Sequence, residues 1–203
     1  MSNNLDADIA VITVTELKDW LDINGTADDK KLRRATFVAT YALEAECKGT
    51  VFVRRTFTED YAAGQVPGRR GGAKRIHLFH GPIVSVTSIT DDDSNTVAST
   101  DYTIVANGGY LEHDSLWPAP VGRWTIIYVA GVFADTDDVS QNVKNVAISY
   151  ASRIYKNKGG DSVQSRSRSG RSGGSSITYA DPSKLTSYEM KMLSEAGYVR
   201  GWV

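Results

Sequence analysis

The three histidines of the chain are the first residues whose chemistry could make a site. His77 and His80 lie three residues apart in a segment predicted to be extended, so we expect their side chains to point to opposite faces of a sheet. His113 lies in a predicted turn. Because a zinc site needs three or four ligands that converge on one point, the sequence predicts no metal site. We interpret the histidines as hydrogen-bonded or exposed side chains.

An acidic pattern resembles the first half of a calcium-binding loop. Asp91, Asp93 and Asn95 have the spacing of the first three ligands of such a loop. However, Thr96 stands where the sharp turn needs glycine, and Tyr102 stands where the bidentate glutamate belongs. We therefore predict an acidic hairpin turn at this position.

The remaining chemical motifs lack the structural context that would make them active. Residues 170–174 fit the nucleophile pattern G-x-S-x-G, but no strand precedes them and no helix follows. The glycine-rich residues 68–72 lack the spacing of a phosphate-binding loop. The lone cysteine, Cys47, lies on a helical pattern and is expected to behave as a small buried hydrophobe. The sequence therefore predicts no enzyme, no cofactor and no metal.

Composition limits the class of protein further. The chain has 203 residues, is 41% hydrophobic and carries a formal net charge of −1. These values fit one soluble globular domain, or one domain with an appendage. The longest apolar run, residues 126–133, is far shorter than the roughly 20 residues that a membrane-spanning helix needs. With acids and bases interspersed, no overall field attracts nucleic acid or a membrane, so any DNA contact must be local.

Helix signals dominate the N-terminal part. Thr13 and Glu16 form a predicted capping box for a short helix that ends near Ile23. We expect Thr26 to cap a longer helix that ends at Gly49. Its main apolar stripe has helical spacing and consists of Leu32, Ala35, Thr36, Ala39, Ala42 and Leu43. A second stripe broadens this face, so we expect cover on more than one side; it consists of Val38, Tyr41 and Ala45.

The pattern changes to a period of two after residue 51, which is typical of strands with one exposed face. Strands are predicted over residues 51–61, 75–79, 83–90, 102–105, 109–112 and 123–129, which makes an antiparallel region of about six strands. Residues 62–74 are predicted to be a solvent-exposed loop whose basic residues include Arg69 and Arg70. The third helix of the chain is predicted from apolar spacing between Val139 and Ile154, and we expect it to pack onto the first two helices.

The C-terminal part has a different composition. Residues 159–176 are rich in Gly, Ser and Arg, which favours a flexible linker, and residues 177–179 could form one short strand. Thr186 and Glu189 repeat the capping-box signature, and Gly197 is expected to end the resulting helix.

A helix of about ten residues is not stable alone in water, so a surface must cover its apolar side chains. Docking of this arm on another chain is the favoured hypothesis, and folding back on its own domain is the alternative. We expect the anchor to be Leu185, Met190, Leu193, Tyr198 and Trp202.

The predicted fold class is α+β: a small helical bundle of three main helices, an inserted antiparallel β-region, and a C-terminal arm that ends in a short helix. The expected divisions are an N-terminal tail (1–9), two core helices (10–50), the β insertion (51–133), the third core helix (134–158), the linker (159–176) and a docking arm (177–203).

The succession of these elements resembles the head-tail connector (adaptor) proteins of tailed bacteriophages. The resemblance rests on TVTELKDWLDI, TADDKKLRRATFVATYALEAECKG, VFVRRTFTEDY, HGPIVSVTSI, WTIIYVAGVF and VSQNVKNVAISYASRIY, which follow one another in the expected order between Thr13 and Tyr155. It implies a structural protein made in the bacterial cytoplasm and assembled as a dodecameric ring in the virion neck. Its implied partners are copies of itself, the portal above, and a stopper or tail protein below, without any membrane.

The resemblance also implies a lumen through which double-stranded DNA passes. A near-neutral subunit suits such a passage better than a clamp, because many phosphate contacts would hold the duplex. We therefore expect an acidic or mixed lumen. Basic loops could touch a protein partner or DNA; their residues are Arg69, Arg70, Arg166, Arg168 and Arg171. The alternatives are a nucleic-acid-binding module that uses these loops, and a stopper or tail-completion protein.

Overall fold

The computed structural model describes residues 9–62, 74–118, 123–156 and 184–198. The chain forms two compact units, one made of residues 1–48 and 139–203 and the other of residues 49–138. The described α-helices belong to the first unit and the described β-strands to the second. The mixed α+β class predicted from the sequence is therefore confirmed.

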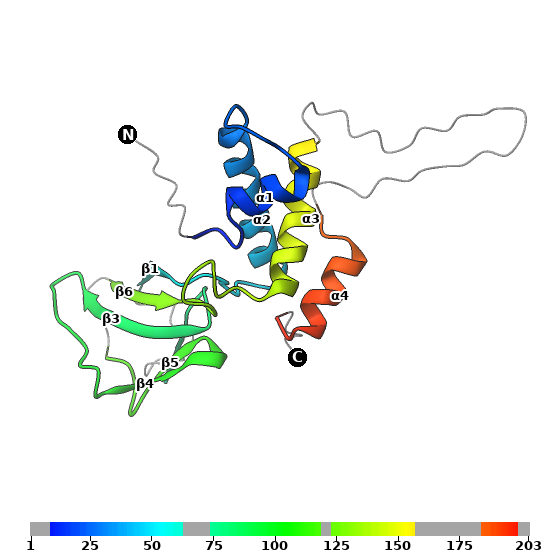
Figure 1. Ribbon diagram of the computed structural model, residues 1–203. Coiled ribbons are helices and arrows are strands. Elements are labelled where there is room, and N and C mark those ends of the chain that lie inside the picture. Colours follow the sequence, from blue (N-terminus) through cyan, green and yellow to red (C-terminus); the bar gives the residue numbers. More distant parts are fainter. Residues whose placement is uncertain (1–8, 63–73, 119–122, 157–183, 199–203) are drawn as a thin grey trace, which may run out of the picture. The chain divides into compact units, whose positions relative to one another are not determined.

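The helical unit is organised around one central helix (Figure 1). Its helices are α1 (Val14–Leu21), α2 (Asp29–Glu46), α3 (Gln141–Lys156) and α4 (Ser187–Glu195). Helix α3 packs against α1, α2 and α4, as expected for α1 and α2. Fully buried side chains of this unit include Ile12, Leu17, Leu32, Leu43, Val143 and Ala147.

Of the three helix caps predicted, those at Thr13 and Thr186 are confirmed. Thr13 accepts a hydrogen bond from the backbone N–H of Glu16, whose carboxylate accepts from the N–H of Thr13 at 2.7 Å. Thr186 and Glu189 form the same reciprocal pair at α4. The predicted cap at Thr26 is wrong, because α2 begins at Asp29 with Asp28 in the cap position and without a side-chain cap bond.

The environment of Asp28 explains this shifted start. Its carboxylate accepts from Lys31 Nζ and from the Tyr155 hydroxyl, each at 2.8 Å, so it joins α2 to α3 instead of capping α2. The carbonyl of Thr26 accepts from the N–H of Asp29 at 3.2 Å in a turn that precedes the helix. Tertiary contacts thus determine where this helix begins.

The second apolar stripe of α2 does not receive the cover that the sequence led us to expect. Val38 is 39% exposed and Tyr41 is 48% exposed, and Ala45 is exposed as well. The main stripe, in contrast, is buried except for the half-buried Ala42, and α1 and α3 pack against α2. The helical unit therefore presents an apolar strip, which we call the α2 stripe, made of Val38, Tyr41 and Ala45.

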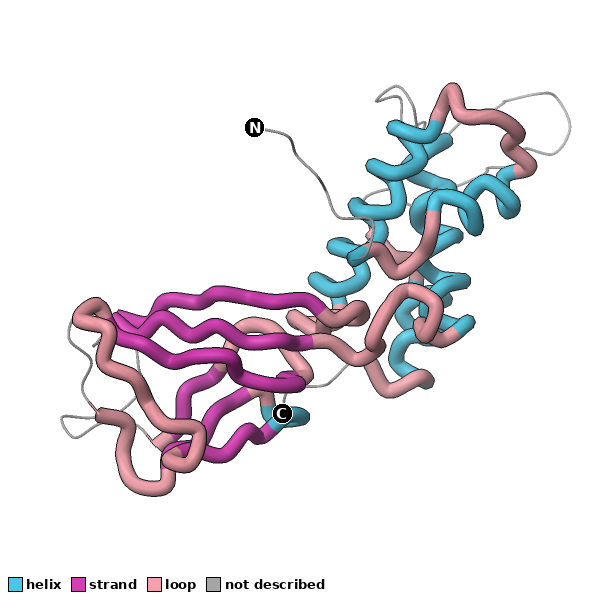
Figure 2. The backbone as a smooth tube through the Cα atoms, turned by 60° about the vertical axis from the view of Figure 1, so that its left-hand side comes forward, coloured by secondary structure: helices cyan, strands magenta, loops and turns pink. Residues whose placement is uncertain are grey.

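The β unit consists of two antiparallel three-stranded sheets that form separate layers (Figure 2). Its strands are β1 (Arg55–Ala62), β2 (Arg75–His77), β3 (Ile83–Asp91), β4 (Tyr102–Val105), β5 (Tyr110–His113) and β6 (Arg123–Ala130). The first sheet has the order β1-β6-β3 and the second has the order β2-β5-β4. The six predicted strands are all present, with ends that differ by a few residues.

The first strand begins four residues later than predicted, at Arg55. The residues before it are buried and bond to other parts of the unit: Val51 N–H donates to the carbonyl of Gly81 at 2.8 Å, and the carbonyl of Phe52 accepts from Phe133 N–H at 2.8 Å. The apolar residues at 51–53 therefore form a buried lead into β1 and do not extend its ladder.

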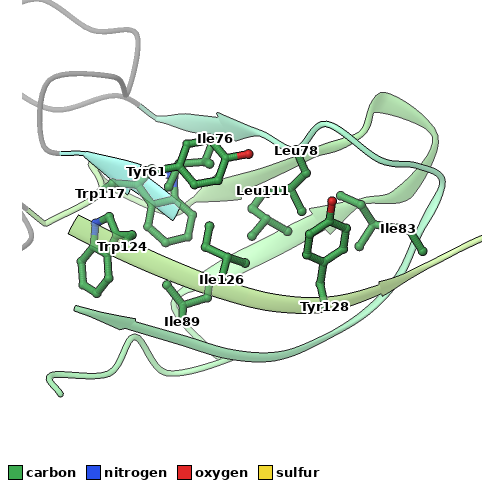
Figure 3. Packing of buried hydrophobic residues seen from close by; sticks show 11 residues of the cluster. Tyr61, Ile76, Leu78, Ile83, Ile89, Leu111, Trp117, Trp124, Ile126 and Tyr128 are labelled. Carbon is green, nitrogen blue, oxygen red and sulfur yellow. The ribbon is translucent and has the colours of Figure 1, made fainter. Parts of the chain in front are cut away.

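The core of the β unit lies between the two sheets (Figure 3). Strand β6 shows the pattern most clearly, because Trp124, Ile126, Tyr128 and Ala130 are buried while the residues between them are partly exposed. The second sheet contributes Ile76 and Leu111 to the same cluster. This alternation fixes the register, since a slip by one residue would turn the buried side chains of β6 outward.

The acidic pattern after β3 forms a turn, as predicted. Asp91 Oδ1 accepts from the backbone N–H of Asp93 at 3.1 Å and of Asn95 at 2.8 Å, and Ser94 has a left-handed φ of 66°. The carboxylate of Asp91 therefore serves the turn itself.

Candidate docking surfaces

Helix α4 is fastened to α3 by a charged contact and an apolar contact. Arg153 of α3 donates two hydrogen bonds to the carboxylate of Glu189, at 2.7 and 2.8 Å. Arg153 also donates to the carbonyl of Lys184 at 3.3 Å. Leu193, one turn after Glu189, is 1% exposed. The face of α4 that carries Glu189 and Leu193 is thus used within the chain.

In the single chain, the arm adopts the alternative arrangement, in which it folds back on its own domain. In the structure α4 lies on its own α3, and Leu193 is not available as an exposed anchor. Leu185, Met190 and Tyr198 are half-buried, and Trp202 lies outside the described residues. The reason for the difference is Arg153, whose guanidinium gives α4 a charged partner that the apolar pattern alone did not reveal.

Sequence reasoning missed Tyr188, whose side chain is 71% exposed. A helical projection centred on Glu189 and Leu193, four residues apart, would have found it, because position 188 lies away from that face. The outer surface of α4 therefore presents an aromatic ring while its inner surface contacts α3.

The end of α4 follows the prediction. Gly197 has a left-handed φ of 81°, its N–H donates to the carbonyl of Ser194 at 2.9 Å, and Tyr198 N–H donates to the carbonyl of Leu193 at 3.0 Å. These two bonds form a Schellman motif, which satisfies carbonyls at the helix end.

The predicted basic contacts cannot be placed. Arg69, Arg70, Arg166, Arg168 and Arg171 lie outside the described residues, as do the predicted linker, the short strand at 177–179 and the G-x-S-x-G motif. Within the described ranges, no group of three or more His, Cys, Asp or Glu side chains could hold a metal ion. Among the described helices, none is both long enough and apolar enough to cross a membrane.

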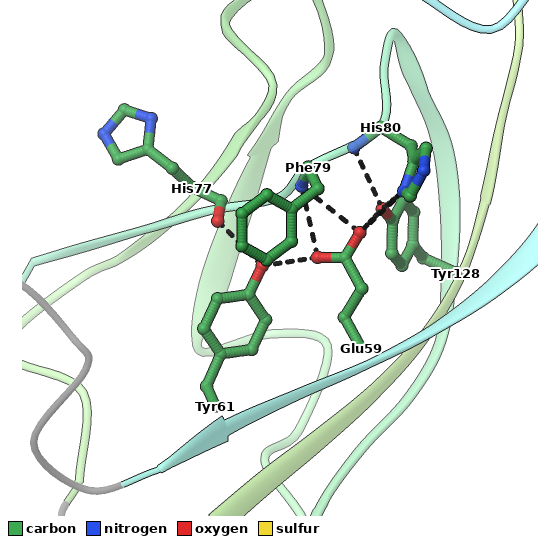
Figure 4. A network of polar contacts seen from close by, with 6 residues as sticks. All are labelled: Glu59, Tyr61, His77, Phe79, His80 and Tyr128. Carbon is green, nitrogen blue, oxygen red and sulfur yellow. Dashed lines mark hydrogen bonds and ion pairs between the residues drawn. The ribbon is translucent and has the colours of Figure 1, made fainter. Parts of the chain in front are cut away.

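A polar network forms around the buried carboxylate of Glu59 in the β unit (Figure 4). The hydroxyls of Tyr61 and Tyr128 both donate to it. The backbone N–H of Phe79 lies 3.2 and 3.1 Å from its two oxygens, and His80 Nδ1 lies 2.9 Å from Oε1. A buried carboxylate needs such partners, because burial without them is costly.

The tyrosines of this network are held in their protonated state. Burial raises the pKa of Tyr61 and of Tyr128 far above the ordinary value of 10, and the hydrogen bond to Glu59 together with its negative charge adds to the rise. Both hydroxyls therefore remain hydrogen-bond donors at any physiological pH. The two tyrosines therefore serve the network as neutral hydrogen-bond donors to the carboxylate of Glu59.

The position of Glu59 in the sequence carried a signal for this site. Phe57, Glu59 and Tyr61 alternate along β1 with exposed residues, so the carboxylate faces inward among aromatic side chains. A charge on the apolar face of a strand indicates buried hydrogen-bond donors that are distant in the sequence. His80, interpreted from the sequence as a hydrogen-bonded or exposed side chain, is bonded to Glu59 and stacks on Phe57 with ring centroids 4.0 Å apart.

The network fixes a short loop, residues 78–81, between β2 and β3. Besides the Phe79 N–H bond, Tyr61 donates to the carbonyl of His77 at 2.8 Å, and His80 N–H donates to the Tyr128 hydroxyl at 3.3 Å. The side chain of Phe79 in this loop is 74% exposed. Figure 4 shows its ring above Glu59 and near Tyr61.

No family model matches the chain. No curated protein matches it either.

Solved structures, in contrast, contain chains of similar fold. A chain in the neck of an empty gene transfer agent (GTA) particle, computed with C6 symmetry, matches with a TM-score of 0.64 and 18% identity over 90% of this chain and 89% of that chain. A chain in the neck of a native GTA particle, computed with C12 symmetry, matches with a TM-score of 0.60 and 18% identity over 88% and 86%. A chain in the virion of a native GTA particle has a TM-score of 0.62 and 20% identity over 91% and 88%. This chain therefore has, over nearly its whole length, the fold of proteins found in GTA necks and virions.

Proposed function

We propose that the chain is a structural subunit of the neck of a phage-like particle, where it acts as a head-tail connector (adaptor). The observation that carries this proposal is the shared fold over about 90% of both chains with a protein in a GTA particle neck. The resemblance of the sequence to adaptor proteins points independently to the same role. A structural role also fits the Glu59 network, whose polar groups are hydrogen-bonded to one another.

The proposed assembly is a ring of copies, with twelve subunits as the expected number. A neck of related fold computed with C12 symmetry supports this number. In the proposed arrangement the ring contacts the portal on one side and a stopper or tail protein on the other, and its lumen passes double-stranded DNA. The subunit charge of −1 suits a passage, because a strongly basic lumen would bind phosphates and slow the duplex.

The C-terminal arm is the proposed portal anchor. Its face with Glu189 and Leu193 is occupied by α3, so the contact uses the exposed Tyr188 and the half-buried Met190 of α4, together with Tyr198 and Trp202 after the helix. Aromatic side chains are common anchors of protein interfaces because they bury much area and lose little rotamer freedom. Leu193 and Glu189 hold the arm in place in this arrangement and do not touch the portal.

The location in the neck is tested by isolating particles from the strain that encodes the chain. Mass spectrometry of purified particles should find the chain, and electron microscopy should place its density between portal and tail. Density in the capsid shell, or absence of the chain from particles, would contradict the proposal. A position in the layer below the adaptor would instead identify a stopper or tail-completion protein.

The portal anchor is tested by deleting residues 186–203 and mixing the shortened chain with a portal ring. Light scattering should show a complex with the full chain and little or none with the shortened chain. If both chains join the portal equally well, the anchor lies elsewhere. The lumen is tested by duplex binding of the assembled ring, which should be weak at all salt concentrations; tight, salt-sensitive binding would favour a nucleic-acid-binding module.

A further inference from the structure

We propose that Phe79 is a preorganised aromatic anchor in the interface between neighbouring copies of this chain. The proposal rests on the proposed ring assembly and assigns one of its contacts. It is carried by an unusual combination, namely a backbone held from several sides and a large apolar side chain that remains 74% exposed.

The backbone N–H groups of residues 78–81 all donate to acceptors outside the loop. Its own N–H bonds to Glu59, and the N–H of His80 bonds to Tyr128 at 3.3 Å. The N–H of Leu78 donates to the carbonyl of Gly109 at 2.9 Å, and the N–H of Gly81 donates to the carbonyl of Gly49 at 3.1 Å. The segment thus has little freedom to turn the ring of Phe79 inward.

Gly49 shows how closely the chain is packed behind this loop. A Cβ atom built on Gly49 would lie 2.5 Å from the carbonyl oxygen of Phe79, and its φ of +82° is one that other residues rarely adopt. The close approach of backbone to backbone brings the loop against the start of the β unit. Together with the Glu59 network, it restricts the backbone position of Phe79.

The buried carboxylate next to Phe79, that of Glu59, is already hydrogen-bonded within the β unit, so the exposed ring suits an apolar partner. Glu59 is taken up by Tyr61, Tyr128 and the loop, and the ring of Tyr61 lies parallel to that of Phe79 at 6.2 Å. An aromatic side chain that is fixed before binding loses little conformational freedom when it docks. Rigid, exposed aromatic residues on loops are a common form of interface anchor.

The symmetry of the related structures indicates a second copy as the occupant. Necks of similar fold were computed with C12 and C6 symmetry, and a closed ring with more than two subunits joins each copy to the next through two unlike surfaces. Apolar side chains exposed on each copy, in its described residues, include Phe79 and, on another element, Val38 and Tyr41 of the α2 stripe. Phe79 therefore contacts a different part of the neighbouring copy and not the neighbour's Phe79.

The test places the photo-crosslinking amino acid p-benzoylphenylalanine at position 79 of the full chain, in particles that assemble around it. The matched control carries it at position 116, because Leu116 is also an exposed apolar residue of the β unit, at 50%. After irradiation, we expect a product of twice the chain's mass from position 79 and much less from position 116. Peptide mapping should place the link on a residue outside the 78–81 loop of the neighbour.

Three results would overturn the proposal: a product containing a different neck protein, a link between two Phe79 loops, or no product at all. Each of these can be obtained while the unmodified chain is found in the neck, so the anchor can fail when the proposed function holds. If the chain is absent from particles altogether, the proposed function itself fails.

A second measurement guards against local perturbation by the crosslinker. Phe79→Ala should leave thermal unfolding unchanged, because the side chain is exposed, and should reduce incorporation of the chain into particles at least about 10-fold. Leu116→Ala should leave both quantities unchanged. Normal incorporation of the Phe79→Ala chain would contradict the proposed anchor.

Discussion

Glu189 of the helical unit and Glu59 of the β unit are both buried, and their carboxylates are satisfied in different ways. In the helical unit Glu189 is paired with a cation, Arg153, which comes from a helix distant in the sequence. In the β unit Glu59 is surrounded by two neutral hydroxyls, a backbone N–H and an imidazole. The ion pair fastens one peripheral helix, whereas the neutral donors tie together a strand, a loop and the core. The same residue type therefore plays two roles. In the helical unit the Arg153–Glu189 pair, which we call the latch, holds one helix. In the β unit the Glu59 network, which we call the central support, connects several elements.

The largest expected effect is that of removing the central support. Glu59→Ala leaves the Tyr128 hydroxyl and the Phe79 N–H as buried donors without their acceptor, and each such group costs about 1 to 3 kcal/mol. We expect the free energy of unfolding to fall by about 3 to 5 kcal/mol, measured by urea denaturation. Tyr61 is less affected, because its hydroxyl can still donate to His77.

Two controls sharpen this measurement. Glu59→Gln keeps the shape and one acceptor oxygen, so it should cost less than the alanine variant. Thr58→Ala changes the neighbouring exposed residue of β1 and should have almost no effect. If Glu59→Ala and Thr58→Ala are equally stable, the network does not support the core.

Breaking the latch should have a smaller and strictly local effect. Arg153→Ala leaves the carboxylate of Glu189 buried, 3% exposed, without its charged partner, which typically costs about 3 kcal/mol or more unless the segment can move into water. Helix α4 can do so by leaving α3, which limits the loss. We expect faster hydrogen exchange across residues 187–195 and unchanged exchange in β1 and β6.

The ion pair between Lys191 and Glu195 provides the control for the latch. It lies on the exposed side of the same helix, with side chains 72% and 67% exposed, so Lys191→Ala should change the exchange of α4 very little. Equal effects of Arg153→Ala and Lys191→Ala would mean that the buried pair does not hold the arm.

Two glycines, one from each unit, can be compared in the same way. Gly49 and Gly25 both have positive φ, +82° and +91°, but a Cβ at Gly49 would meet the carbonyl of Phe79 at 2.5 Å while a Cβ at Gly25 would meet nothing within 4 Å. Gly25→Ala should cost about 1 kcal/mol from backbone strain alone. Gly49→Ala should cost more, about 2 to 3 kcal/mol, because the loop must also shift.

Thermal unfolding of both glycine variants would measure the difference. The Gly49 variant should also show altered chemical shifts at Phe79 and His80, which the Gly25 variant should not. Equal losses in the two variants would show that the loop yields easily, and this would weaken the argument for a fixed Phe79.

What the sequence predicted well follows from local rules. The capping boxes at Thr13 and Thr186 depend only on residues three apart, and the alternation along β6 depends only on neighbours along one strand. The six strands and the α+β class were predicted for this reason.

The errors arose where distant residues decide the outcome. At the start of α2, the Asp28 carboxylate accepts a hydrogen bond from the Tyr155 hydroxyl, 127 residues away, and makes no side-chain cap bond to the helix. The packing of α4 depends on Arg153, which lies 36 residues before Glu189. The role of Glu59 depends on donors up to 69 residues away. The exposed α2 stripe could not be recognised from periodicity, because a helical pattern shows which side chains share a face but not which faces are covered.

The smallest change to the latch is a change of pH, because acid removes the charge of Glu189 without replacing any residue. We expect acid to release α4. Burial alone would raise the pKa of Glu189, but hydrogen bonds from Arg153, from Thr186 and from Ser149 outweigh burial and hold the pKa below its ordinary value of 4.5. Because the pKa is lowered in the folded state, the charged form contributes stability at every pH above the ordinary value. That contribution is lost only as the pH falls below 4.5 and through the lowered pKa.

Hydrogen exchange of α4, corrected for the intrinsic pH dependence of exchange, should therefore be constant from pH 7 to pH 5 and should accelerate below about pH 4. In Arg153→Ala the acceleration with acid should disappear, because the variant has already lost the pair that acid would break. Opening of α4 between pH 5 and 6 in the unmodified chain would contradict the lowered pKa and would point to a different group as the trigger. Since the same carboxylate is tested by mutation and by protonation, agreement between the two would assign the hold on the arm to the Arg153–Glu189 pair.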